Sequence, residues 1–337
     1  MTFRFLTAGE SHGPALGVTL EGLPAGIPVS ADLIAADLAR RQRGYGRGGR
    51  MSIEQDRAEI LAGVRRGRTL GSPVLLLVRN RDWENWTQVM LVEALSADEV
   101  VALASLADEG NKRALPVTRV RPGHADLAGA LKYGFDDVRD VLERASARET
   151  TVRVAAGAVC RAFLRQVGIE AWSFTVAVGD VAVDPTNANR TRGETEESPL
   201  RCPDPAAEAR MIAAIDDARS AGDTLGGVFE VVATGVPVGL GSHVHWDRRL
   251  DGALAQAICS IQAVKGVEFG LGFEQTRRPG SLVHDVIEGV GEDPAAPGIP
   301  GLDDGPVRRW LHRTNAAGGL TGGISNGDDI VVRMAVK

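Results

Sequence analysis

The sequence predicts a mixed α+β protein, in which strands and helices follow one another without a regular βαβ rhythm. Three observations support this class. Short β-branched segments are spread over the whole chain, segments with helical periodicity lie between them, and 44% of the 337 residues are hydrophobic, enough for a sizeable core. No change of composition marks a linker, so we expect a single domain over residues 1–337.

Six short segments are expected to be strands, because they are rich in β-branched residues and some of them alternate between apolar and polar positions. These segments are Leu16 to Leu20, Val74 to Val78, Trp172 to Val178, Val228 to Ala233, Leu282 to Ile287 and Ile330 to Val336.

Helices are expected where a capping residue precedes a run with helical periodicity, and two runs begin with a capping box of serine and glutamate. The box of Ser96 and Glu99 opens a helix to about Asp108. The box of Ser146 and Glu149 opens a helix whose apolar face is Val152, Ala156, Val159 and Phe163. The other expected helices are Ser30 to about Arg41, Ala206 to Ala218, Arg248 to Ile261 and Val307 to Arg313. Two polar stretches, Asp184 to Asp204 and Gly289 to Gly305, are expected to be long surface loops.

The formal charge of −6 argues against nucleic acid or an anionic membrane as a partner. The longest aliphatic run, Pro73 to Val78, is too short to span a bilayer, and the N-terminus has no signal-like segment. We therefore expect a cytoplasmic protein. Its three cysteines are widely spaced without a metal-binding pattern, which indicates reduced thiols in the core.

Two histidines stand in glycine-containing segments that are typical of ligand sites. His12 lies in the segment G-E-S-H-G of residues 9–13, and His124 lies in R-P-G-H-A-D of residues 121–126. An imidazole can act as a general acid near neutral pH, and a neighbouring carboxylate favours its protonated form. Alone, the first motif favours a surface histidine in a turn, and the second is about as compatible with an incidental histidine beside a helix-start aspartate.

Arginines cluster in two further segments. Residues 40–50 contain five arginines among glycines, and a pair of arginines flanks the expected helix start at Ser146. Guanidinium groups bind phosphate and carboxylate bidentately, and a helix N-terminus favours anions. A small polyanion is therefore the favoured ligand. The alternatives are a solvated basic loop and an RNA contact, and RNA is disfavoured by the acidic net charge and by a single aromatic residue, Tyr45, in the loop.

The combination of these motifs resembles the chorismate synthase family. Residues 9–24 (G-E-S-H-G-P-A-L-G-V-T-L-E-G-L-P) are similar to its first signature, and residues 143–151 (E-R-A-S-A-R-E-T-T) to its second. The stretches R-R-Q-R-G-Y-G-R, R-P-G-H-A-D, G-S-H-V-H-W-D-R-R-L-D, S-I-Q-A-V-K-G and R-T-N-A-A-G-G-L-T-G-G-I-S-N-G also resemble the family, in the same order. The resemblance covers essentially the whole chain.

The resemblance implies a β-α-β sandwich that forms a homotetramer, and a lyase that eliminates phosphate from enolpyruvylshikimate phosphate (EPSP) to give chorismate. The reaction requires reduced FMN without net redox change. By the same resemblance, His12 protonates the leaving phosphate, Ser11 relays protons, and His124 lies near the flavin. The implied substrate residues are Arg41, Arg47, Arg50 and Arg121. The implied flavin residues are Arg144, Ala145, Ser146, Gln262, Ala263, Gly322 and Lys337.

Members of the family continue beyond the segment that matches Val331 to Lys337 into a third signature. The resemblance therefore implies that the given chain lacks this segment, and a catalytically impaired, shortened homologue is one alternative. A second is an NADPH-dependent flavin reductase activity in the same site. No G-x-G-x-x-G segment follows a clear strand, so the sequence does not decide this point.

Overall fold

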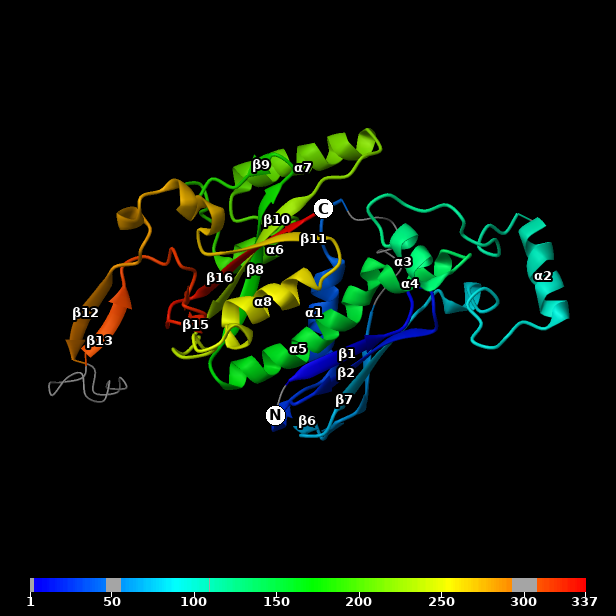
Figure 1. The fold of residues 1–337 in the computed structure, drawn as a ribbon, viewed down its shortest axis with the longest axis horizontal. Helices are drawn as coiled ribbons and strands as arrows, with labels where there is room; N and C mark the ends of the chain where they lie inside the picture. The colour runs from blue at the N-terminus through cyan, green and yellow to red at the C-terminus, as the bar shows by residue number, and fades with distance from the viewer. Residues whose placement is uncertain (1–2, 47–55, 109, 293–307) are drawn as a thin grey trace. The chain divides into compact units, whose positions relative to one another are not determined.

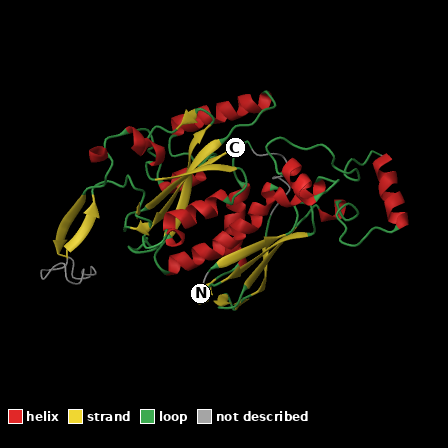
Figure 2. Ribbon diagram, viewed as in Figure 1, coloured by secondary structure: helices red, strands yellow, loops and turns green. Residues whose placement is uncertain are grey.

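The computed structural model describes residues 3–46, 56–108, 110–292 and 308–337, and it divides into two compact units, Met1–Val167 and Gly168–Lys337 (Figure 1). Each unit contains an antiparallel sheet together with helices (Figure 2). The predicted α+β class is confirmed. The division into one domain stays a prediction.

The first unit is built on a four-stranded antiparallel sheet with the strand order β1-β2-β7-β4. Its strands are β1 Arg4–Ala8, β2 Ala15–Glu21, β7 Val74–Arg79 and β4 Ala58–Ala62. Alternate residues of β2 and β7 are apolar and buried, as period-two patterning requires. The sequence predicted β2 and β7, whereas β1 and β4 were not expected.

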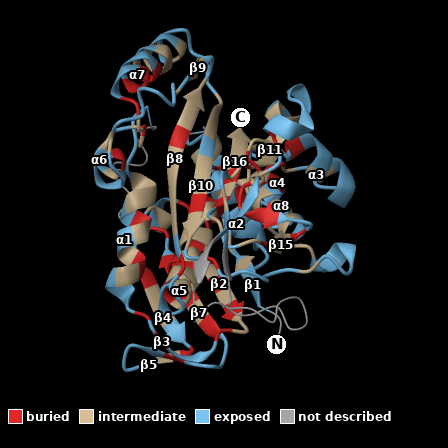
Figure 3. Ribbon diagram, turned by 90° about the vertical axis from the view of Figure 1, so that its left-hand side faces the viewer, coloured by how far each residue is buried: buried red, intermediate tan, exposed pale blue. Residues whose placement is uncertain are grey.

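Two helices cover the apolar face of this sheet. Helix α1 (Ala31–Gln42) contributes Ile34 and Leu38 to the core, and α5 (Thr150–Gln166) contributes Val152, Val159 and their neighbours (Figure 3). Ser30 caps α1 by accepting a hydrogen bond from the Leu33 N–H. The predicted cap of α1 and the predicted apolar face of α5 are both confirmed.

The remaining elements of the first unit are shorter. Ser96 and Glu99 form the predicted capping box before α2, since each side chain accepts a hydrogen bond from the other residue's backbone N–H. These elements are β3 Ala25–Pro28, β5 Val64–Arg65, β6 Arg68–Leu70, a 3₁₀ helix at Trp83–Asn85, α2 Ala97–Asp108, α3 Asp126–Tyr133, α4 Arg139–Ala145 and η3 Ala147–Glu149.

The second unit contains a five-stranded antiparallel sheet with the order β11-β16-β10-β8-β9. Three of these strands match the predicted segments near 172, 228 and 330. The strands are β8 Glu170–Val178, β9 Val181–Ala182, β10 Gly227–Thr234, β11 Val264–Phe269 and β16 Ile330–Val336.

Helices α7 (Pro205–Ser220) and α8 (Leu250–Cys259) of this unit lie near their predicted places. Asp204 caps α7 by accepting from the N–H groups of Ala206 and Ala207. The predicted loop 184–204 contains a short helix, α6 Arg192–Glu197, with its own capping box of Thr191 and Glu194. The other elements are the 3₁₀ helices Trp246–Arg248, Gly272–Arg277 and Gly280–Leu282 and the strands β12 Ile287–Glu292, β13 Arg308–His312, β14 Leu320–Thr321 and β15 Ile324–Ser325.

Two predicted elements are wrong. The expected strand Leu282 to Ile287 is a 3₁₀ turn followed by an irregular segment, and the strand begins only at Ile287. The expected helix Val307 to Arg313 is the strand β13, which pairs with β12. The predicted loop Gly289 to Gly305 begins inside β12, and residues 293–305 lie outside the described residues.

The predicted capping box of Ser146 and Glu149 is also wrong. Ser146 accepts from the Arg148 N–H and caps η3, while α5 starts at Thr150. The Glu149 carboxylate instead accepts from the Thr7 hydroxyl and from Arg153. The contacts of Glu149 are thus a tertiary one with Thr7 and an i,i+4 pair with Arg153, in place of the expected box.

The cysteines are free thiols, of which Cys202 is buried, Cys160 half-buried and Cys259 exposed. Burial raises the pKa of the Cys160 thiol to about 11. The core location expected for all three is wrong for Cys259. Among the described residues, no helix combines the length and the apolar character that crossing a bilayer requires.

Candidate active site

The segment Glu143–Thr150, which we call the hub segment, links α4 to α5 and holds several predicted site residues of the first unit. It includes the end of α4, the turn η3 and the first residue of α5. Its members contact the loop after β1, the end of α1 and the residue Asp56. Residues far apart in the sequence are thus gathered at one turn.

His12 is fastened to the hub segment through Glu143. The Glu143 carboxylate accepts a hydrogen bond from the His12 backbone N–H at 2.8 Å and lies 2.8 Å from the imidazole Nδ1. The Ser11 N–H donates to the Glu143 backbone carbonyl at 3.0 Å. Gly9 makes the turn possible, because its φ is +101° and a Cβ there would lie 2.4 Å from the Ala15 carbonyl oxygen. The segment G-E-S-H-G is therefore a structured loop.

The His12 ring also packs against Trp86. The two ring centroids lie 3.9 Å apart with an interplanar angle of 31°. The Trp86 indole donates to Asp82 at 2.8 Å, and the guanidinium groups of Arg113 and Arg139 lie 5.2 and 5.6 Å from its ring. The carboxylate and the indole thus fix the imidazole from two sides, while 18% of its side chain remains exposed.

Arg41 reaches the opposite end of the hub segment. Its guanidinium donates to the Thr150 hydroxyl at 3.2 Å and to the Ala147 carbonyl at 3.4 Å, and it lies 3.6 Å from the Asp56 carboxylate. Arg148 binds the same carboxylate with two nitrogens at 2.9 and 3.2 Å. A predicted substrate arginine is therefore held beside the hub segment by a buried carboxylate. Arg47 and Arg50 lie outside the described residues.

The Arg144 side chain is hydrogen-bonded to residues at and just after the end of β1. Its guanidinium donates to the Thr7 carbonyl, the Thr7 hydroxyl and the Gly9 carbonyl at 2.9, 2.7 and 3.1 Å. These contacts fix the end of β1 and the start of the His12 loop. Ala145 and Ser146, the adjacent predicted flavin residues, are half-buried.

Arg121, His124 and Asp126 form a second cluster around a fully buried carboxylate. The Asp126 carboxylate accepts from the Arg121 Nε at 2.9 Å and lies 2.5 Å from the His124 Nδ1. The Arg121 hydrogen bond is the main reason that the pKa of Asp126 is lowered to about 2. The same hydrogen bond raises the pKa of Arg121, and the charges of Asp126 and Glu143 add to this effect. The contact between His124 and its acidic neighbour, which the sequence alone left open, is thus present in the structure.

This pKa shift predicts an acid dependence of stability. Asp126 binds its proton less tightly in the folded state, so it stabilises the fold above about pH 4, and this contribution is lost as the pH falls towards about 2. We expect Asp126→Asn to be less stable than wild type in urea at about pH 6, with the difference shrinking at about pH 2.5. An equal difference at both pH values would show that ionisation of Asp126 does not stabilise the fold.

In the second unit, three of the predicted flavin residues come together. The Lys337 N–H donates to the Ala263 carbonyl at 3.1 Å, and Gln262 precedes Ala263 in the same turn. Ala263 has a φ of +67°, a conformation that a non-glycine residue adopts at an energetic cost and that is frequent at functional sites. An amide, exposed backbone and an ammonium group suit a polar cofactor that carries a phosphate, so this part of the donor set fits a flavin nucleotide.

Gly322 lies apart from this group. The turn Gly322–Gly323 contacts the start of α8, where the Leu250 N–H donates to the Gly323 carbonyl at 2.9 Å, whereas Gln262 follows the end of α8. A helix of 10 residues is about 15 Å long. Within this unit the structure therefore does not bring Gly322 to the Gln262 turn.

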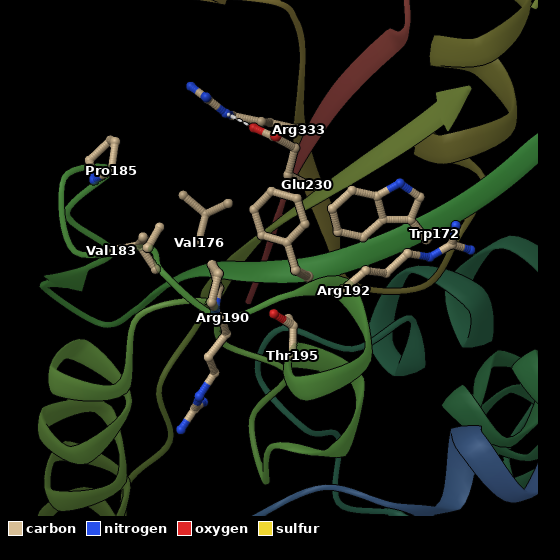
Figure 4. A pocket seen from close by; sticks show the side chains of 12 residues that line it. Trp172, Val176, Val183, Pro185, Arg190, Arg192, Thr195, Glu230 and Arg333 are labelled. Carbon is tan, nitrogen blue, oxygen red and sulfur yellow. Dashed lines mark hydrogen bonds and ion pairs between the residues drawn. The ribbon is translucent and has the colours of Figure 1, made fainter. Parts of the chain in front are cut away.

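A cavity of about 360 Å³ lies on one face of the second unit's sheet (Figure 4). Trp172, Phe174 and Val176, alternate residues of β8, line it together with the ion pair of Arg333 and Glu230 at 2.6 Å. None of the predicted site residues that the structure describes is among its lining residues. Its arginines are engaged in ion pairs with neighbouring glutamates. We assign no role to this cavity.

The histidines outside the two clusters are structural or surface groups. His245 lies 2.6 Å from Asp247 and is more than half exposed, and His312 lies 2.7 Å from Asp328. In the part of the chain that the structure describes, no group of histidine, cysteine, aspartate and glutamate side chains could hold a metal ion.

Sequence reasoning missed Glu143, Asp56 and Trp86. Glu143 opens the second signature-like segment, but its contact with His12 spans 131 residues. The sequence analysis predicted no helix over α4 (Arg139–Ala145), so no local pattern singled Glu143 out. The pair of Asp56 and Arg148 spans 92 residues and had no local signal.

An α+β fold in which a buried carboxylate fixes one histidine, with arginines held on the same hub segment, offers groups suited to proton transfer and anion binding. The family model for chorismate synthase matches residues 3–337. The chain belongs to the chorismate synthase family, and it is accordingly a carbon–oxygen lyase of aromatic amino-acid biosynthesis.

The similarity to individual members is extensive. The chorismate synthase of Symbiobacterium thermophilum is 55% identical over 337 residues, which are 99% of this chain and 80% of that protein. The chorismate synthase of Thermobifida fusca is 53% identical over 338 residues, with the same coverage. A crystal structure of chorismate synthase superposes with a TM-score of 0.76 at 43% identity, covering 100% of this chain and 84% of that chain.

Proposed function

We propose that this chain eliminates phosphate from EPSP to give chorismate, with His12 as the proton donor to the leaving phosphate. The observation that carries this assignment is the contact of His12 with Glu143, because it holds a titratable ring at a defined place and orientation. Ser11, which is buried next to His12, is the proposed proton relay.

EPSP carries two carboxylates and a phosphate, so its binding requires several cations. The proposed substrate residues are Arg41, Arg47, Arg50 and Arg121. Arg41 and Arg121 are supported by their anchoring, since each is held by an aspartate that orients the guanidinium. A guanidinium whose rotamer is already fixed loses less entropy when it binds an anion.

Reduced FMN is the proposed cofactor, held by Arg144, Ala145, Ser146, Gln262, Ala263, Gly322 and Lys337. Bound at the site, it supplies an electron-rich group that can donate electron density to the substrate. The turn of Gln262 and Ala263 beside Lys337 supports this assignment in the second unit. Since the described N–H groups of Arg144 contact Thr7 and Gly9, we propose that Arg144 acts by fixing the His12 loop. His124 is the proposed histidine near the flavin.

Arg41→Lys should weaken EPSP binding although the charge is retained. A lysine ammonium cannot bind Thr150 and an anion with the two-pronged geometry of a guanidinium. Loss of one charge-assisted hydrogen bond, about 1.5 to 3 kcal/mol, corresponds to roughly a 10- to 150-fold increase in Kd. Calorimetry measures it, with Arg57→Lys as the control, because Arg57 is exposed and pairs with Asp32 on the surface. Equal affinities of Arg41→Lys and wild type would remove Arg41 from the substrate site.

Anaerobic incubation with EPSP and chemically reduced FMN tests the proposed function. We expect release of phosphate and formation of chorismate without NADPH. The alternative activity, NADPH-dependent flavin reduction, is tested separately by anaerobic NADPH oxidation with bound FMN. NADPH oxidation without phosphate release from EPSP would favour the reductase and contradict the lyase.

A homotetramer located in the cytoplasm is the proposed state of the protein. Trp310 and Ile287, which are 53% and 61% exposed on the hairpin β12–β13, support association of copies. Light scattering during size-exclusion chromatography measures the mass, and a monomeric mass at micromolar concentration would contradict the tetramer.

A further inference from the structure

Glu143 has a buried carboxylate that is hydrogen-bonded to His12. Only 2% of the residue is exposed, and within the described residues every hydrogen bond to its carboxylate comes from His12. Burying a carboxylate is unfavourable unless a partner compensates it. The imidazole and the backbone N–H of His12 are that partner.

This geometry dictates where the proton of the neutral ring resides. A carboxylate is only an acceptor, so the His12 Nδ1 must carry a hydrogen in order to bond to it at 2.8 Å. The nitrogen that gains and loses a proton is then Nε2. Stacking of the ring on Trp86 at 3.9 Å opposes its rotation. The carboxylate thereby selects one tautomer and one orientation.

We propose that Glu143 is a positioning residue, which fixes His12 as the Nδ1–H tautomer and leaves Nε2 as the atom that delivers the proton to the substrate. This inference rests on the proposed role of His12 and deepens it. Asp126 differs from Glu143, because its carboxylate is shared between His124 and Arg121. Glu143 therefore differs from Asp126 in that the described hydrogen bonds of its carboxylate come from a single histidine.

Glu143→Gln is the discriminating variant. Both donors of His12, the backbone N–H and Nδ1–H, lie 2.8 Å from the same carboxylate oxygen of Glu143, and Nδ1 also lies 2.9 Å from the other oxygen. In glutamine, an amide oxygen in the first place keeps the backbone hydrogen bond, and the NH₂ group in the second place offers Nδ1 a donor, which favours the ring proton on Nε2. We expect turnover to fall roughly 10²- to 10⁴-fold, as for loss of a general acid, while the Kd of EPSP changes less than about threefold.

The tautomer can be read without substrate or flavin. Protein labelled with ¹⁵N-histidine gives distinct nitrogen shifts for the two neutral tautomers, and His12→Asn assigns the signal. We expect Nδ1–H in wild type, Nε2–H in Glu143→Gln, and Nδ1–H again in Glu143→Asp, which keeps the acceptor and should recover part of the turnover. Glu149→Gln is the matched control, because Glu149 is a buried carboxylate of the same hub segment that contacts Thr7 and Arg153. It should leave the His12 tautomer unchanged.

The outcomes separate this inference from the proposed function. An Nε2–H tautomer in wild type, or an unchanged tautomer in both Glu143→Gln and Glu143→Leu, of which leucine has no acceptor, would overturn the positioning role even if the wild-type chain converts EPSP. If Glu143→Gln does not fold, Nε2–H in the Glu143→Asp variant would overturn it instead. The expected tautomers together with no conversion of EPSP by the wild-type chain would refute the lyase assignment and leave the positioning of His12 intact.

Discussion

His12→Ala should lower the turnover of EPSP by roughly 10²- to 10⁴-fold, the range usual for removal of a general acid. The substitution removes the imidazole that Glu143 orients and that packs on Trp86, while the backbone N–H of residue 12 can still donate to Glu143. The fold should therefore survive, and steady-state phosphate release measures the loss.

The control for this variant is His245→Ala. His245 also lies against a carboxylate, Asp247 at 2.6 Å, but its side chain is 58% exposed and lies outside both histidine clusters. Turnover of the control should stay within about a factor of two of wild type. Near-wild-type turnover by a folded His12→Ala protein would assign the proton donor to another group.

Asp56→Ala should destabilise the first unit by about 3 to 5 kcal/mol, the usual consequence of removing one partner of a buried ion pair. Asp56 and Arg148 are 3% and 7% exposed in their side chains, and Arg148 binds both carboxylate oxygens. The substitution removes the described carboxylate partner of Arg148 and an anchor of Arg41. We expect a lower urea midpoint together with weaker EPSP binding.

Asp32→Ala is the matched control for Asp56→Ala. Asp32 pairs with Arg57 at 2.7 Å, but the two side chains are 88% and 68% exposed. Exposed pairs contribute about 0 to 1 kcal/mol because water screens them. Similar stability losses for both variants would show that the pair of Asp56 and Arg148 is not a buried anchor.

The sequence correctly predicted those strands and helices whose own residues carry a long apolar pattern. The alternation of Leu16, Val18 and Leu20 marks a strand with one buried face, and the spacing of Val152, Ala156 and Val159 marks a buried helix face. Both patterns are long enough to separate period two from period 3.6. The structure accordingly has β2 and α5 at these places.

The two elements whose secondary structure was predicted wrongly are short segments. Segment 307–313 is too brief to separate the two periods, and its strand state arises from pairing with β12, which lies about 20 residues earlier in the chain. The box of Ser146 and Glu149 failed because the Glu149 carboxylate accepts from the distant Thr7 hydroxyl and from Arg153 one turn later in α5. Pairings between distant segments carry no local signal.

In the candidate site, too, groups that lie in sequence motifs were predicted and their distant partners were not. The combination of motifs, through the resemblance to the chorismate synthase family, indicated His12, His124, Arg41 and Arg121, since each motif alone left a structural role open. The carboxylate of Glu143 contacts His12 across 131 residues, and Asp56, which contacts Arg41, follows the arginine loop without a motif of its own. The sequence thus predicted which groups act, and the structure shows what holds those that it describes.

The central claim is that this chain eliminates phosphate from EPSP without net redox change. One anaerobic reaction tests it most directly, with purified protein, EPSP, chemically reduced FMN and no NADPH, in which phosphate, chorismate and oxidised flavin are measured together over many turnovers. The account predicts equal amounts of phosphate and chorismate and no accumulation of oxidised flavin. Absence of phosphate release by folded protein saturated with flavin, or oxidation of one flavin for each phosphate released, would contradict it.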